Sequence, residues 1–140
     1  KREEQKDVSE KSIKGLHILL AEDNELNMEI AEFMLQNEGA DVTKAWNGQE
    51  AVELFRKSEP GEFDVILMDI MMPVMNGYEA TKMIRSLDRE DAKTIPIIAM
   101  TANAFTEDRQ KAKEAGMNEH IVKPVDVELL IKVIHKLVEY

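Results

Sequence analysis

The sequence feature that most constrains the fold is a continuous apolar run that ends in a single carboxylate. Residues 65–68 (VILM) are all β-branched or long aliphatic, and Asp69 follows them directly. An uninterrupted run of this kind is typical of a central strand in a parallel sheet that helices cover on both faces. Pro73 then ends the strand pattern. We therefore predict an α/β fold with Asp69 at the carboxyl end of a buried strand, where open α/β sheets bind ligands.

Further strand patterns alternate with helix patterns along the chain. The predicted strands are 17–21, 41–45, 65–69, 96–101 and 119–122, and the predicted helices are 24–37, 47 to before Pro60, 77–87, 106–115 and 126 to the C-terminus. A charged loop is expected at 88–94. Such alternation favours a parallel sheet with helices on both faces, because each right-handed crossover packs its helix back onto the sheet. We predict a doubly wound five-stranded parallel sheet with five helices.

The length of 140 residues and the apolar content of 44% suit one domain with a real core. Residues 1–15 are mostly charged and bury too little surface to offset their ordering entropy. We therefore predict a charged linker at 1–15 and a folded domain at 16–140. A short amphipathic helix that continues from a preceding domain is the alternative for the linker.

Composition excludes several classes of function. A net charge of −10 argues against direct nucleic acid binding, which needs clustered Lys and Arg. The absence of cysteine excludes disulfides and a thiol nucleophile, and it fits a cytoplasmic location. No apolar run of about 18 residues occurs, so we expect no membrane contact by this segment.

Two acidic residues, Glu22 and Asp23, follow the first predicted strand. If the strands take the common order 2-1-3-4-5, these side chains meet Asp69 at one crevice. Carboxylates so gathered repel one another by about 4 kcal/mol per close pair at an effective dielectric near 20, and the cluster therefore needs a cation. Oxygen ligands in a half-open site favour Mg²⁺. A solvated acidic rim without an ion is the alternative.

A hydroxyl and an ammonium group follow two other strands, at Thr101 and Lys123. Both would point at the same crevice from neighbouring strand ends. A metal, a hydroxyl and an ammonium around one carboxylate form a set suited to phosphoryl transfer, because the charges stabilise the transferring group while Asp69 accepts it. This recurrence outweighs the simpler interpretation that Asp69 only caps a turn.

Over residues 16–140 the chain resembles the receiver domain of two-component response regulators. The matching motifs are Glu22-Asp23, Asp69 with Met72-Pro73 and Asn76-Gly77, Thr101-Ala102 and Lys123-Pro124, in this order at four strand ends. Two stretches of sequence are most similar to receivers of hybrid sensor histidine kinases, namely AMTANA at 99–104 and MMPVMNGYEAT at 71–81. The resemblance implies the flavodoxin-like strand order 2-1-3-4-5.

The resemblance further implies that Asp69 accepts a phosphoryl group from a phosphohistidine on a histidine kinase or a histidine phosphotransfer domain. Mg²⁺ would be held by Asp23, Asp69 and the backbone carbonyl of Met71, with Glu22 acting through a metal-bound water. Such a domain catalyses its own aspartyl phosphorylation and dephosphorylation and is not a conventional enzyme by itself.

The family also implies a switch. Thr101 would hydrogen-bond one phosphoryl oxygen and Lys123 would pair with another, because phosphorylation adds about −1.5 to −2 charge and new acceptors. His120 stands where the family usually has an inward-turning Phe or Tyr. It is either a switch residue or a plain surface histidine, and its imidazole would make the switch sensitive to pH.

Two other classes of protein share part of this pattern. A flavodoxin-like cofactor binder needs N–H donors after its first strand, whereas residues 22–25 (EDNE) would repel a phosphate. A Mg²⁺-dependent phosphatase with an aspartyl-phosphate intermediate is the alternative function. Such enzymes usually carry a second Asp two residues after the nucleophile, where this chain has Met71.

The helix predicted at 24–37 has apolar side chains over a wider arc than one sheet face can bury. We expect the surplus to dock the kinase or phosphotransfer module. Leu26 is the favoured contact, because it lies in the first turn after Asp23. Deeper packing, or cover by the linker, is the alternative.

Overall fold

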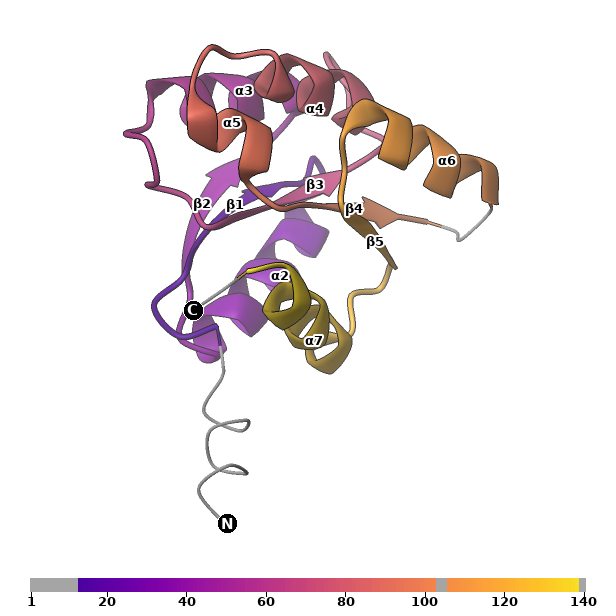
Figure 1. The fold of residues 1–140 in the computed structure, drawn as a ribbon. Coiled ribbons are helices and arrows are strands. Elements are labelled where there is room, and N and C mark those ends of the chain that lie inside the picture. The colour runs from indigo at the N-terminus through magenta and orange to yellow at the C-terminus, as the bar shows by residue number, and fades with distance from the viewer. Residues whose placement is uncertain (1–12, 103–105, 139–140) are drawn as a thin grey trace.

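Five parallel strands form the centre of the molecule, and helices cover both faces of the sheet (Figure 1). The computed structural model describes residues 13–102 and 106–138, with only the backbone of residues 106–108. The strands are β1 (His17–Ala21), β2 (Asp41–Ala45), β3 (Val65–Asp69), β4 (Ile97–Thr101) and β5 (Glu119–Val122). Their order is β2-β1-β3-β4-β5, and every neighbouring pair is parallel. The predicted doubly wound fold and its strand order are confirmed.

Helices form two layers, one on each face of the sheet. The described helices are α2 (Glu25–Asn37), α3 (Gly48–Lys57), α4 (Gly77–Arg85), α5 (Glu90–Thr94), α6 (Thr106–Ala115) and α7 (Val127–Leu137). In Figure 1, α2 and α7 lie on one side of the sheet, whereas α3, α4 and α5 lie on the other. Among the described residues, no helix combines the length and the apolar character needed to cross a bilayer.

The core is divided between these two faces, because successive side chains of a strand point in opposite directions. Leu19 and Ile66 pack with the apolar side chains of α3 and α4. Their neighbours Ile18 and Leu67 pack with those of α2 and α7. All five residues of β3 are buried, as expected for a central strand covered on both sides.

The described part of the chain contains one helix more than the five predicted. The sequence predicts a charged loop at 88–94, whereas Glu90–Thr94 form the short helix α5. Its support is tertiary: the Arg89 guanidinium donates to the carbonyl oxygens of Phe55 and Ser58, each at 3.0 Å, and to the Asp91 carboxylate. These contacts join α5 to the end of α3. Because they are polar and come from distant residues, no apolar periodicity in the local sequence predicts the helix.

Capping side chains mark where strand-end loops become helices. Asn24, Asn47, Asn76 and Asp126 each accept a hydrogen bond from a backbone N–H in the first turn of the following helix. These bonds satisfy donors that a helix leaves unpaired at its start. These bonds fix where the four helices begin after the strands that precede them.

The folded domain begins before residue 16. Ile13 is fully buried against α2 and α7, and the Gly15 N–H donates to the Gly39 carbonyl oxygen at 2.9 Å. Part of the predicted linker is therefore packed with the domain. Residues 1–12 lie outside the described residues, and their role as a linker stays a prediction.

Candidate functional site

Three carboxylates meet at the carboxyl ends of β1 and β3. Ala21 lies beside Met68 in the parallel register, so the residues that follow, Glu22 and Asp69, emerge side by side. One carboxylate oxygen from each of Glu22, Asp23 and Asp69 lies within 4.8 Å of the others. Glu22 is 2% exposed and Asp69 3%, whereas Asp23 is exposed. The cluster therefore has a buried side and a side open to solvent.

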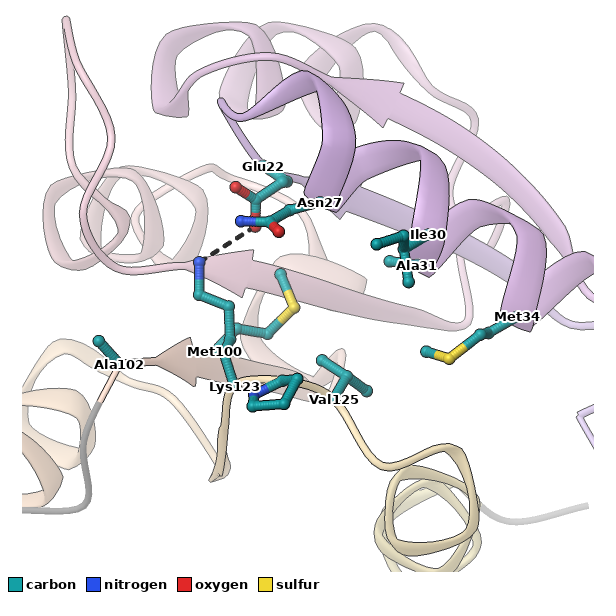
Figure 2. A pocket seen from close by; sticks show the side chains of 10 residues that line it. Glu22, Asn27, Ile30, Ala31, Met34, Met100, Ala102, Lys123 and Val125 are labelled. Carbon is teal, nitrogen blue, oxygen red and sulfur yellow. Dashed lines mark hydrogen bonds and ion pairs between the residues drawn. The ribbon is translucent and has the colours of Figure 1, made fainter.

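Lys123 inserts its ammonium group between the two buried carboxylates. Its Nζ lies 3.2 Å from Asp69 Oδ2 and 3.3 Å from Glu22 Oε1. Figure 2 shows the lysine side chain reaching from the end of β5 toward Glu22. The backbone helps to place it, because the Lys123 N–H donates to the Thr101 carbonyl oxygen at 2.7 Å. One cation thus faces two carboxylates at the centre of the site.

Thr101 ends β4 next to the acceptor strand. Asp69 lies beside Met100 in the register, so Thr101 comes one residue beyond that pair. Thr101 is 6% exposed. The structure therefore brings the hydroxyl-bearing residue to the same edge of the sheet as Asp69 and Lys123, on the strand between them.

The electrostatics of the cluster oppose ionisation of Asp69. Burial and repulsion by Glu22 raise the pKa of Asp69 from its usual 3.8 to about 6, although attraction by Lys123 acts in the other direction. Burial lowers the pKa of Lys123, but Asp69 and Glu22 outweigh that effect and raise it overall. At neutral pH the site therefore holds an ionised carboxylate that gains from any further positive charge.

The loop that follows Asp69 returns to the strand end. The Gly77 N–H donates to the Ile70 carbonyl oxygen at 2.8 Å, and a Cβ at Gly77 would lie 2.3 Å from the Asp69 carbonyl oxygen. Only glycine fits this approach. Met71 lies in the loop, two residues after Asp69, and its side chain is 75% exposed. The sequence motif included Gly77, but the close contact that requires it becomes visible only in three dimensions.

His120 faces α6 in this structure. Its Nε2 accepts a hydrogen bond from Arg109 Nε at 2.9 Å, so that nitrogen carries no proton. Burial lowers the pKa of His120, Arg109 lowers it further, and Glu119 acts in the opposite direction. The same side chains line a hollow of about 330 Å³ between α6 and β5. His120 is therefore held neutral against the helix, and its role as a switch stays a prediction.

Leu26 is exposed on the first turn of α2, as expected from the width of the apolar arc. It is 63% exposed, and Ile30 and Phe33 on the same helix are exposed as well. A cavity of about 370 Å³ lies beside this helix, between Ile30 and Met34 of α2 and the loop at Val125 (Figure 2). Sequence reasoning missed this cavity, because it forms only where α2 packs beside the loop after β5.

Fold and site together define a doubly wound α/β domain with a phosphoryl-transfer set at the carboxyl edge of its sheet. The sequence model for the response regulator receiver domain matches residues 18–135. The chain belongs to this family, as the resemblance implied.

Relatives of the chain include histidine kinases. It is 36% identical to Histidine kinase 1 of Arabidopsis thaliana, over 92% of this chain and 13% of that protein. It is 45% identical to Hybrid signal transduction histidine kinase M of Dictyostelium discoideum, over 86% of this chain and 5% of that protein. The chain thus spans only a small part of these relatives.

Two solved receiver domains illustrate the structural likeness. One, from the sensor histidine kinase PA1611 of Pseudomonas aeruginosa, holds a magnesium ion in its active site cleft; it is 39% identical, with a TM-score of 0.78 over 88% of this chain and 97% of that one. The other, Ssk1 of Saccharomyces cerevisiae, was crystallised with the histidine phosphotransfer protein Ypd1; its structure is 32% identical, with a TM-score of 0.79 over 89% of this chain and 90% of that one.

Proposed function

We propose that Asp69 is the phosphoacceptor of this receiver domain and takes its phosphoryl group from a phosphohistidine on a histidine kinase or a histidine phosphotransfer domain. One observation carries the proposal: a buried carboxylate with a raised pKa lies in contact with Lys123 and beside two further carboxylates at a strand end. A carboxylate placed in this way has lost much of its hydration, and it gains from the positive charge that phosphoryl transfer requires.

The transfer forms one bond and breaks one. A carboxylate oxygen of Asp69 attacks the phosphorus atom while the phosphorus–nitrogen bond of the donor breaks, and the electron pair of that bond stays on the imidazole nitrogen. The negative charge then moves outward from the Asp69 carboxylate onto the phosphoryl oxygens. Lys123, now 3.2 Å from Asp69 Oδ2, follows that charge and pairs with a phosphoryl oxygen. The Thr101 hydroxyl donates to another oxygen.

The acidic cluster fits Mg²⁺, because it offers only oxygen ligands and is open on the Asp23 side. Asp23, Asp69 and the backbone carbonyl of Met71 would hold the ion, and Glu22 would contribute through a bound water. When bound, the ion supplies positive charge that offsets the repulsion among the carboxylates and the charge of the phosphoryl group. The magnesium-bound receiver from Pseudomonas aeruginosa supports this assignment.

The same geometry supports a switch. Thr101 and Lys123 are joined through the backbone, and His120 is three residues before Lys123 on the strand that packs against α6. Movement of Thr101 toward a phosphoryl group leaves space beside β5. We propose that the His120 side chain moves into this space. Its release would break the hydrogen bond to Arg109 and loosen α6.

Incubation with acetyl phosphate tests the proposal, because this donor needs no docking surface. With Mg²⁺ present, intact mass spectrometry should show a single phosphoryl adduct, and a chelator should reduce it at least tenfold. In the Asp23→Asn variant, Mg²⁺ should increase labelling much less than in wild type, because the substitution removes an exposed metal ligand and leaves the core intact. Equal labelling with and without the ion would contradict the metal site, and absence of any adduct would contradict the function.

A second expectation concerns the protein donor. Leu26→Asp should slow transfer from phosphorylated Ypd1 by about tenfold, since a docked leucine contributes roughly 1.5 to 3 kcal/mol of apolar burial. Labelling of this variant by acetyl phosphate should stay within about twofold of wild type, because that donor needs no docking surface and no apolar contact is lost. Met83→Asp is the matched control, because Met83 is also exposed but lies on α4, on the other face of the sheet. If both donors become equally slow, Leu26 supports the fold and not docking.

A further inference from the structure

The loop after Asp69 contains a backbone conformation that its sequence disfavours. Val74 has a φ of 69°, and among the described residues no other residue except glycine has a positive φ. The Met75 N–H donates to the Pro73 carbonyl oxygen at 2.7 Å, which closes a three-residue turn around Val74. This is the rarer and more strained type of γ-turn. A β-branched residue is a poor choice for it, because its side chain crowds the backbone at positive φ.

The surrounding structure holds this turn in place. The Gly48 N–H, at the start of α3, donates to the Met75 carbonyl oxygen at 3.1 Å, and a Cβ at Gly48 would lie 2.2 Å from that oxygen. On the other side, Gly77 closes the loop onto the end of β3 through its bond to Ile70. The starts of two helices thus fix the loop. Strained residues persist where their surroundings over-determine the backbone in this way, and they are frequent at functional sites.

The fold itself gains little from the valine side chain. Val74 is 74% exposed, so its side chain adds almost nothing to the core. Asparagine or glycine would adopt the same positive φ more easily. The chain therefore keeps an exposed apolar group at a position where a polar or absent side chain would make the domain more stable. An apolar group presented in this way is available for contact with another molecule.

The position of the loop identifies that molecule. The loop begins at Ile70 and returns to it at Gly77, so Val74 lies on the rim around the proposed acceptor. Phosphoryl transfer requires the donor nitrogen to approach Asp69 closely and in line. A protein that brings a phosphohistidine to this point must cover the rim. Leu26 follows β1 and Val74 follows β3, the two strands whose ends carry the acidic cluster.

We infer that Val74 is a specificity-determining residue for the protein phosphodonor: its rigidly presented isopropyl group contacts an apolar surface beside the phosphohistidine. This inference rests on the proposed function. The turn fixes the side chain before the donor arrives, so that little conformational freedom is lost on docking. The arrangement exchanges stability of the free domain for recognition, a trade that is common at functional sites.

The inference makes stability and transfer change in opposite directions. In Val74→Asn, the thermal midpoint should rise by about 2 to 4 °C, because asparagine tolerates positive φ. Transfer from phosphorylated Ypd1 should fall by about tenfold, since the apolar contact is lost. Labelling by acetyl phosphate should match wild type. Val74→Ile keeps the apolar group and should transfer at the wild-type rate, and Met83→Asn is the control for loss of an exposed apolar side chain elsewhere.

Four outcomes would overturn the inference. Three of them concern the variants: wild-type transfer from Ypd1 to Val74→Asn, an equal loss with acetyl phosphate and Ypd1, and lower stability in both Val74→Asn and Val74→Gly. Failure of wild type to accept from Ypd1, with acetyl phosphate labelling intact, would also overturn it. Failure of wild type to accept from acetyl phosphate is different, because that result contradicts the proposed function itself.

Discussion

Asp69→Asn is expected to abolish phosphorylation and, at the same time, to stabilise the unmodified domain at neutral pH. The loss follows from removal of the proposed nucleophile, and neither acetyl phosphate nor phosphorylated Ypd1 should give an adduct. The gain follows from the cluster: asparagine has nearly the shape of aspartate but no charge to be buried beside Glu22. A substitution that removes function and adds stability is the signature of a site that holds unfavourable charge.

The sign of the effect depends on the direction of the pKa shift. The pKa of Asp69 is raised from 3.8 to about 6 in the folded state, so the folded protein holds this proton more tightly than the unfolded chain. That contribution is complete below the unfolded pKa and is lost as pH rises through the folded pKa. Above about pH 7 the wild-type domain lacks this stabilisation, and its free energy of unfolding is lower by up to about 3 kcal/mol than with Asp69 protonated.

Thermal unfolding without Mg²⁺ measures this effect. The difference between Asp69→Asn and wild type should be small near pH 4 and should grow through the interval from about 4 to 6, to reach several degrees at about pH 7. Asp88→Asn, in the loop before α5, is the control for removal of an acidic side chain outside the cluster. A phosphoryl adduct on Asp69→Asn would contradict the acceptor assignment. A pH-independent difference would contradict the raised pKa.

Much of the site could be predicted because parallel strands all end at one edge of a sheet. The continuous apolar run before Asp69 identified a doubly covered central strand, and the sheet now places that strand between β1 and β4. Once the strand ends were known, the residues immediately after them had to lie near one another. Glu22, Asp23, Thr101 and Lys123 therefore followed from spacing along the chain, without any knowledge of side-chain contacts.

What could not be predicted depends on contacts between residues that are distant in sequence. The helix α5 is supported by Arg89, whose guanidinium binds carbonyl oxygens at the end of α3 and lies 4.5 Å from the ring centroid of Phe55. The hydrogen bond between Arg109 and His120 is of the same kind. The positive φ of Val74 opposes local preference, and local preference is what a sequence pattern reports. Each of these features required the packed chain.

The contact of Lys123 with two carboxylates was also beyond the sequence, and it leads to a further expectation. Lys123→Met should destabilise the domain at about pH 7.5 without Mg²⁺, by on the order of 1 to 3 kcal/mol, because Glu22 and Asp69 stay buried without their cation. The folded-state pKa of Lys123 is raised, so the lysine is charged at about pH 7.5 and its stabilising effect is lost as pH rises through the folded pKa, above the unfolded value of 10.5. On the acid side, protonation of Asp69 near its pKa of about 6 removes part of the same effect. Labelling by acetyl phosphate should fall by about 10² or more, since removal of one electrostatic contact to a transferring group has costs of that size.

A double-mutant cycle separates the interaction from packing. In the Asp69→Asn background, Lys123→Met should cost clearly less than in wild type, because only Glu22 then loses its partner. Lys132→Met is the matched control, since Lys132 is an exposed lysine on α7. Mg²⁺ should restore part of the stability of the Lys123→Met protein, as a second source of positive charge beside the same carboxylates. If Lys123→Met lowers the free energy of unfolding equally in both backgrounds, Lys123 stabilises the fold through its aliphatic stem. The charge of Lys123 would then give no support to its proposed pairing with the phosphoryl group.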